Sequence, residues 1–163
     1  MKTEPKKPCY IDIGDLNVGK IYHWDYADKD QDLHFRINSM GGDLQTSVYL
    51  MKRMMKEKRK VITENFGQCQ SGGFIAFIGG QERLSSKENT FMFHSGNTNG
   101  NFTIDSLQNF LNKCEMTYLQ QIMRLTKISN RPSKYWSDIL KSDKNVFFTG
   151  KELYKLGIVT KIV

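Results

Sequence analysis

The order of apolar and polar residues predicts a chain that alternates between strands and helices. Residues 33–37 alternate in the manner of a short strand, which is followed by a turn at the glycine pair of the motif NSMGG. From residue 46 to about residue 58 the apolar positions recur with helical period, and residues 61–66 are again typical of a strand. This order predicts a strand, turn, helix, strand unit of the βαβ kind.

The middle of the chain predicts a second and more deeply buried unit. A stretch of small or polar residues around Ser71 interrupts the strand pattern. The apolar run FIAFIGG that follows predicts a buried helix beginning at Ser71 or Gly72. The segments at Leu84 and at residues 91–93 indicate two further short strands before His94.

The C-terminal third is predicted to be mainly helical. Apolar residues at steps of three or four predict a long amphipathic helix over about residues 103–126, and the pair Arg131-Pro132 separates it from a short second helix. Thr149 and Glu152 have the spacing of a capping box, in which each side chain bonds the backbone N–H of the other residue. The final segment, IVTKIV, predicts a closing strand.

Composition indicates a soluble globular protein. The chain has 163 residues, of which 39% are hydrophobic and 25% are charged, and it contains no apolar run of the roughly 18 residues that a membrane span needs. We expect a single domain over residues 11–163, preceded by a mobile tail of residues 1–10. The polar start, MKTEPKKPCY, lacks the apolar stretch of a secretory signal, so a cytoplasmic location is expected.

The cysteines and histidines give no indication of a disulfide framework or a metal site. Three cysteines, at positions 9, 69 and 114, are scattered and odd in number, so reduced thiols are expected. The three histidines, at positions 23, 34 and 94, share no short motif with them. We therefore expect no metal and no other cofactor.

The net charge of +7 raises the question of an acidic partner. The densest basic run lies in residues 52–60, on the face of the predicted helix opposite its apolar stripe. A solvated helix face is the simpler interpretation, and an acidic or nucleic-acid partner is the alternative. No arginine-rich arm, zinc-finger spacing or aromatic RNA-binding motif supports a nucleic-acid-binding function.

Ser71 and His94 are the residues best placed for chemistry. A serine at the start of a helix lies beside unpaired backbone N–H groups, which favours a nucleophile, although a plain N-cap is the simpler interpretation. His94 comes where a strand ends and a Ser-Gly loop begins, which is a common place for catalytic groups and for ordinary surface histidines. Neither residue is decisive alone.

Three motifs taken together resemble the signature blocks of the Clp protease proteolytic subunit, a family of serine peptidases. They are INSMGG at residues 37–42, GQCQSGG at residues 67–73 and FMFHS at residues 91–95, and they occur in the family's order. The family's usual forms are INSPGG, a G-x-A-A-S-M-G context and an apolar block M-I-H-Q. The ending VFFTGKELYKLGIVTKI is similar to a fourth block, so the resemblance covers about residues 33–163.

The resemblance implies a crotonase-like α/β fold, a spiral of ββα units in one domain. It implies that Ser71 is the nucleophile, that His94 is the general base, and that the backbone N–H groups of Gly42 and Gly72 form the oxyanion hole. The implied function is that of a serine endopeptidase that hydrolyses peptide bonds of unfolded polypeptides without a cofactor.

The implied partners are a polypeptide substrate, other copies of the chain in a homo-oligomeric ring, either a heptamer or a double ring, and an AAA+ unfoldase. No membrane partner is expected. The long helix over about residues 103–126 would mediate contact between rings, and a core helix of the monomer is an equally good interpretation of its apolar stripe.

The third member of the catalytic triad is open between two residues. In the family an aspartate stands two residues before the aromatic of the C-terminal block, and in this chain that place is Asn145. Asp143 takes the role if the loop carries a small insertion. We expect Asp143, with Asn145 as the alternative. An asparagine would orient the imidazole without stabilising the imidazolium by charge.

Other positions also depart from the family pattern. Met40 replaces the proline of the oxyanion turn, and Cys69 and Gln70 replace an alanine pair before the nucleophile. The region before residue 33 is shorter than usual and offers only YIDIGDL and a short VGKIYHWDY segment. These departures are typical of a compact, divergent member, for example one encoded by a phage. They leave a catalytically weak or inactive structural subunit of a ring as the alternative function.

Overall fold

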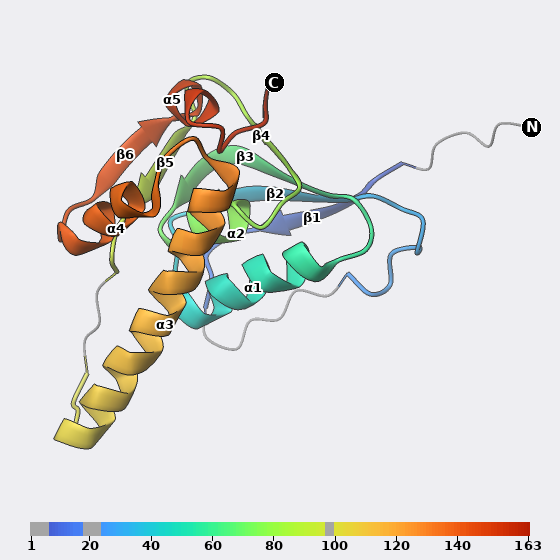
Figure 1. The fold of residues 1–163 in the computed structure, drawn as a ribbon. Coiled ribbons are helices and arrows are strands. Elements are labelled where there is room, and N and C mark those ends of the chain that lie inside the picture. The colour runs from blue at the N-terminus through green and yellow to red at the C-terminus, as the bar shows by residue number, and fades with distance from the viewer. Residues whose placement is uncertain (1–6, 18–23, 97–99) are drawn as a thin grey trace, which may run out of the picture.

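The fold is organised around one mainly parallel sheet (Figure 1). The computed structural model describes residues 7–17, 24–96 and 100–163. Within these residues seven strands form the sheet in the order β1-β2-β3-β4-β7, and β5 pairs with both β3 and β6. The pairings are parallel except for the antiparallel pair of β5 and β6. The predicted α/β fold is confirmed.

The first half of the chain builds the centre of the sheet. Its strands are β1 (Cys9–Ile13), β2 (Leu33–Ser39) and β3 (Val61–Gln70), and α1 (Leu44–Lys56) connects the last two. Alternate residues of β2 are fully buried, as expected when successive side chains point to opposite faces of a sheet. β2, α1 and β3 form the predicted βαβ unit.

The second half adds the remaining elements around this centre. They are α2 (Gly72–Phe77), β4 (Glu82–Ser85), β5 (Thr90–Phe93), α3 (Ile104–Ile128), α4 (Ser133–Lys141), β6 (Val146–Thr149), α5 (Gly150–Lys155) and β7 (Lys161–Ile162). Every residue of α2 is buried, which agrees with its almost wholly apolar sequence. The capping box of α5 is confirmed, because the Thr149 N–H donates to Glu152 Oε2 at 2.7 Å and the Glu152 N–H donates to Thr149 Oγ1 at 3.2 Å.

The long helix α3 packs against the domain through its C-terminal half. Gln121 and Leu125 are its buried residues, and Arg124 donates hydrogen bonds to the carbonyl oxygens of Ile78 at 2.7 Å and Gly80 at 2.9 Å. The N-terminal half projects away from the body of the domain (Figure 1). The interpretation as a core helix therefore applies to the C-terminal half alone.

The first strand begins inside the segment predicted to be a tail. Cys9 and Tyr10 fall in the expected tail of residues 1–10, yet both belong to β1. The Cys9 N–H donates to the Asp32 carbonyl oxygen at 2.8 Å, and parallel pairing with β2 fixes the strand. Residues 1–6 and most of the segment VGKIYHWDY lie outside the described residues.

In the described part of the chain no helix combines the length and the apolarity that crossing a membrane requires.

Candidate active site

Ser71 stands at a sharp turn between β3 and α2. Its φ of 49° is rare for a residue with a side chain, and such strained positions occur often at functional sites. The Ser71 N–H donates to the Met92 carbonyl oxygen at 2.8 Å, which ties the turn to β5. The side chain makes no capping hydrogen bond to α2. The hydroxyl therefore does not cap the helix, and the interpretation as a plain N-cap is wrong.

His94 follows directly after β5 and faces this hydroxyl. Its Nε2 atom lies 2.8 Å from Ser71 Oγ, which is hydrogen-bonding distance. Burial lowers the pKa of His94 from its ordinary value of 6.5, while hydrogen bonding to the Asn145 side chain acts in the opposite direction. The neutral imidazole that results at pH 7 is the form that can accept a proton from the serine.

A side chain of the long helix α3 hydrogen-bonds the backbone beside His94. The Tyr118 hydroxyl donates to the Ser95 carbonyl oxygen at 2.6 Å. This bond connects α3 to the residue that follows the histidine. It therefore restricts the position of the loop from which the imidazole projects.

The two candidates for the third triad position both lie near His94 but differ in what they contact. Asp143 and Asn145 line one small polar cavity of about 310 Å³ together with His94. Asn145 is the one whose side chain hydrogen-bonds the imidazole. Asp143 sits in the turn before β6, where its φ is 52°. The antiparallel pairing of Val146 with Phe93 brings Asn145 to the histidine.

The backbone N–H groups of Gly42 and Gly72 lie close together beside Ser71. A Cβ atom built on Gly72 would lie 3.3 Å from Gly42 N, and one built on Gly41 would lie 2.7 Å from Ser71 Cβ. Within the described residues neither the Gly42 nor the Gly72 N–H donates a backbone hydrogen bond. Two unpaired donors at one point form a site for a negatively charged oxygen.

The turn that carries the Gly42 N–H is fixed by residues just after β1. The Asp15 carboxylate accepts a hydrogen bond from the Met40 N–H at 2.8 Å, and the Leu16 N–H donates to the Gly41 carbonyl oxygen at 2.7 Å. Gly42 has a φ of +133°, and a Cβ atom there would collide with the Leu16 carbonyl oxygen. Only glycine fits at this contact.

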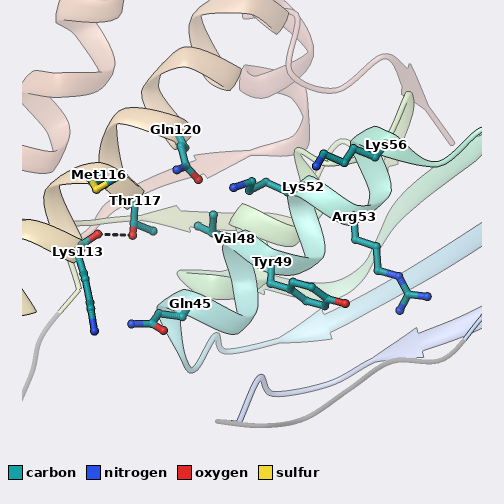
Figure 2. A pocket seen from close by; sticks show the side chains of 10 residues that line it. All are labelled: Gln45, Val48, Tyr49, Lys52, Arg53, Lys56, Lys113, Met116, Thr117 and Gln120. Atoms are coloured by element: carbon teal, nitrogen blue, oxygen red, sulfur yellow. Dashed lines mark hydrogen bonds between the residues drawn. The ribbon is translucent and has the colours of Figure 1, made fainter.

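A cavity of about 540 Å³ opens beside Ser71 and His94. One side of it is formed by Gly42, Gly72 and Ile75, and the other by residues of α3 that include Phe110, Leu111, Cys114 and Tyr118. The apolar side chains suit the side chains of a peptide, while the polar groups gather at the serine. A second hollow lies next to it, between α1 and α3 (Figure 2).

The other histidine of the described chain has a structural environment. His34 Nε2 lies 2.8 Å from Glu64 Oε2, across the pair β2 and β3 and away from the serine. His23 lies outside the described residues. The sequence analysis did not identify the supporting roles of Asp15 and Tyr118. Their partners are distant in sequence, and no local pattern marks them.

The sequence of the chain matches a known protein family over almost its whole length. A family model described as Clp protease matches residues 8–163. The match includes Ser71, His94, the turns that carry Gly42 and Gly72, and the strand that follows Asn145. It also extends the resemblance to β1, which the motifs alone did not cover. With this match over almost its whole length, the chain belongs to the Clp protease family.

Proposed function

We propose that the chain is a serine endopeptidase subunit that hydrolyses peptide bonds of unfolded polypeptides through an acyl-enzyme at Ser71. The observation that carries this proposal is the 2.8 Å contact between Ser71 Oγ and His94 Nε2 beside two unpaired backbone N–H groups. A nucleophile, a base and an oxyanion site within reach of one another are the parts that acyl transfer needs.

In the acylation step Ser71 Oγ attacks the peptide carbonyl carbon while His94 Nε2 takes the hydroxyl proton. The carbonyl oxygen becomes negative and accepts hydrogen bonds from the Gly42 and Gly72 N–H groups. The C–N bond then breaks, and His94 returns the proton to the departing amine. In deacylation a water molecule repeats the attack, gives its proton to His94, and releases the carboxylic acid with the serine hydroxyl restored.

In this proposal Asn145 is the third member of the triad, and Asp143 is the alternative. The Asn145 side chain hydrogen-bonds the imidazole, which supports an orienting role. It carries no charge, so it stabilises the imidazolium of the transition state less than an aspartate would. The proposed enzyme is therefore a slow peptidase compared with a Ser-His-Asp enzyme.

A serine-reactive fluorophosphonate tests the proposal. We expect covalent labelling at Ser71, located by mass spectrometry, with loss of labelling in both Ser71→Ala and His94→Ala. Ser86→Ala is the matched control, because this serine lies in the turn after β4 and should leave labelling unchanged. Absence of labelling in the folded wild-type protein would contradict an active peptidase.

The proposed assembly is a homo-oligomeric ring, with an AAA+ unfoldase as a further partner. Support comes from exposed apolar side chains of α3 that line neither hollow, namely Ile104, Leu107, Leu119 and Met123. Exposed apolar side chains on a projecting helix are typical of an interaction surface. Light scattering tests the proposed assembly by measuring its mass. Met123→Glu should lower that mass. Asn109→Glu is the control and should leave the mass unchanged, because Asn109 is a polar, exposed residue of the same helix.

A second function is supported by one specific observation. The residue that hydrogen-bonds His94 is Asn145, whose amide is neutral. A neutral partner is compatible with a catalytically weak or inactive subunit that contributes structure to a ring. Assembly without labelling would support this alternative, and labelling of Ser71 that depends on His94 would reject it.

A further inference from the structure

The groove between α1 and α3 is rich in positive charge (Figure 2). It has a volume of about 580 Å³, and none of the 10 residues that line it is acidic. Val48, Tyr49 and Met116 give it an apolar floor, and Lys52, Lys56 and Lys113 stand at its edges. The groove thus offers both apolar contact and cationic groups to anything that lies in it.

The three lysines are available for a partner. Among the described residues, the ion pairs of this chain include none that involves Lys52, Lys56 or Lys113. Arg53, which also lines the groove, is already engaged: its Nη2 lies 2.8 Å from Asp25 Oδ2, and its guanidinium lies 3.7 Å from the centre of the Trp24 ring. The inference therefore depends on the lysines alone.

The groove adjoins the cavity at Ser71. Gln45, Lys113 and Thr117 line both hollows, so the two share a common wall. A polypeptide bound beside the serine would therefore lie next to the groove that runs along α1. Lys113 stands at the junction.

We propose that this groove binds acidic residues of the substrate, a few residues to one side of the bond that is cleaved. The inference rests on the proposed peptidase function and adds a substrate preference to it. Lys52 lies seven positions beyond Gln45 on α1, or about 10 Å along a helix, and Lys56 lies about 16 Å beyond it. An extended peptide advances about 3.3 Å per residue, so aspartate or glutamate side chains about three to five residues past the junction would reach these lysines.

Cleavage of a peptide series tests the preference. A quenched fluorescent peptide of neutral sequence is made in versions that carry two glutamates, or two lysines, at each distance from the cleaved bond. Glutamates placed a few residues from the cleaved bond, on one side of it, should raise kcat/KM about three- to tenfold over the neutral peptide. Lysines at the same positions should lower kcat/KM. The difference should shrink at high salt, because the lysines are exposed to solvent.

Reversing the charge of Lys52 tests whether the groove causes the preference for glutamate. Lys52→Glu should reverse the preference, so that the peptide with lysines becomes the better substrate. Lys161→Glu is the matched control, since it changes the net charge equally but lies in β7. Equal effects of the two substitutions, or equal cleavage of the glutamate and lysine peptides, would overturn the proposal.

Binding to the Ser71→Ala protein separates this inference from the proposed function. Fluorescence anisotropy with the same peptides needs no cleavage, so a glutamate preference that Lys52→Glu removes supports the groove even if the wild-type protein shows no peptidase activity. Cleavage without a preference for glutamate would support the proposed peptidase function and contradict the proposed role of the groove. A single-stranded oligonucleotide that binds tightly, and only when Lys52 is present, would identify a nucleic-acid site and overturn the peptide assignment.

Discussion

The Asp15 carboxylate accepts a hydrogen bond from the Met40 N–H at 2.8 Å, at the place where the related motif INSPGG has a proline. Proline fixes φ and has no N–H, whereas methionine leaves the turn less restricted and adds a donor. The carboxylate satisfies this donor, and the Met40 N–H lies on the same turn as the Gly42 N–H. Asp15 is thus placed to position the proposed oxyanion site from outside the turn.

Asp15→Ala should slow fluorophosphonate labelling of Ser71 about tenfold or more, because the Gly42 donor loses its fixed position. Met40→Pro should restore the rate in the double variant, since proline removes the unsatisfied N–H and restricts φ. Asp12→Ala is the control, because Asp12 pairs with Arg36 at 2.7 Å on the exposed part of β1. If Asp15→Ala costs as much in the Met40→Pro background as alone, Asp15 does not act through Met40.

Asn145→Asp should accelerate Ser71 labelling and peptide hydrolysis by about tenfold or more. A carboxylate at this place would stabilise the imidazolium that forms when His94 takes the serine proton. The kinetics of a burst-phase ester substrate measure the change. Asp143→Asn should change the rate less than about twofold; a large loss there, with no gain from Asn145→Asp, would make Asp143 the third member.

The rate of labelling should rise with pH and reach half of its maximum below pH 6.5. Burial lowers the pKa of His94, and only the deprotonated imidazole accepts the serine proton, so the active form is gained at a lower pH than for an ordinary histidine. A pH profile from 4.5 to 8 tests this. In Asn145→Asp the midpoint should move upward, since a nearby negative charge favours the protonated ring. A wild-type midpoint above pH 6.5 would contradict the environment described for His94.

Glu57→Gln should reduce the free energy of unfolding at pH 7 by about 1 to 2 kcal/mol, a typical range for hydrogen bonds to a charged group. Hydrogen bonds from Arg59 and from the Trp24 indole, at 2.9 Å each, lower the pKa of Glu57 from 4.5 to about 2. A carboxyl whose pKa is lowered by folding contributes stability above pH 4.5 and loses it as the pH falls toward 2.

Urea unfolding at several pH values checks this expectation. The difference between Glu57→Gln and wild type should be full at pH 7 and shrink between pH 4.5 and pH 2. Asp12→Asn is a comparison variant, since its ion pair is largely exposed and should contribute little. A difference that stays constant down to pH 2 would show that the carboxylate charge is not the cause.

Elements with a clear period could be predicted from sequence, and elements defined by their neighbours could not. α1 and α3 follow from apolar stripes, and the start of α5 follows from its capping box. β3 continues to Gln70 past a glycine and polar residues, because a register shift with β2 and pairing with β5 keep it extended. β6 is four residues long and mostly not buried, and its pairing with β5 defines it.

Some residues of the candidate site could likewise be predicted from the sequence, and others could not. Ser71, His94 and the two glycine turns stand in contiguous motifs, which is why they could be named before the fold was known. The loop before β6 has no such motif, and counting residues does not establish whether Asp143 or Asn145 meets the imidazole. The cross-strand pair of Phe93 and Val146 places Asn145 there, and this contact joins residues far apart in the chain.

The pairing of β6 with β5 also bears on when the proposed active site can form during synthesis of the chain. Ser71 and His94 leave the ribosome well before Asn145, so a growing chain holds the nucleophile and the base while the residue that hydrogen-bonds the imidazole is still missing. Proteins are made from the N-terminus at a finite rate, and strands pair only once both are available. The proposed peptidase would therefore reach its working geometry only after Asn145 has been synthesised and β6 has paired with β5.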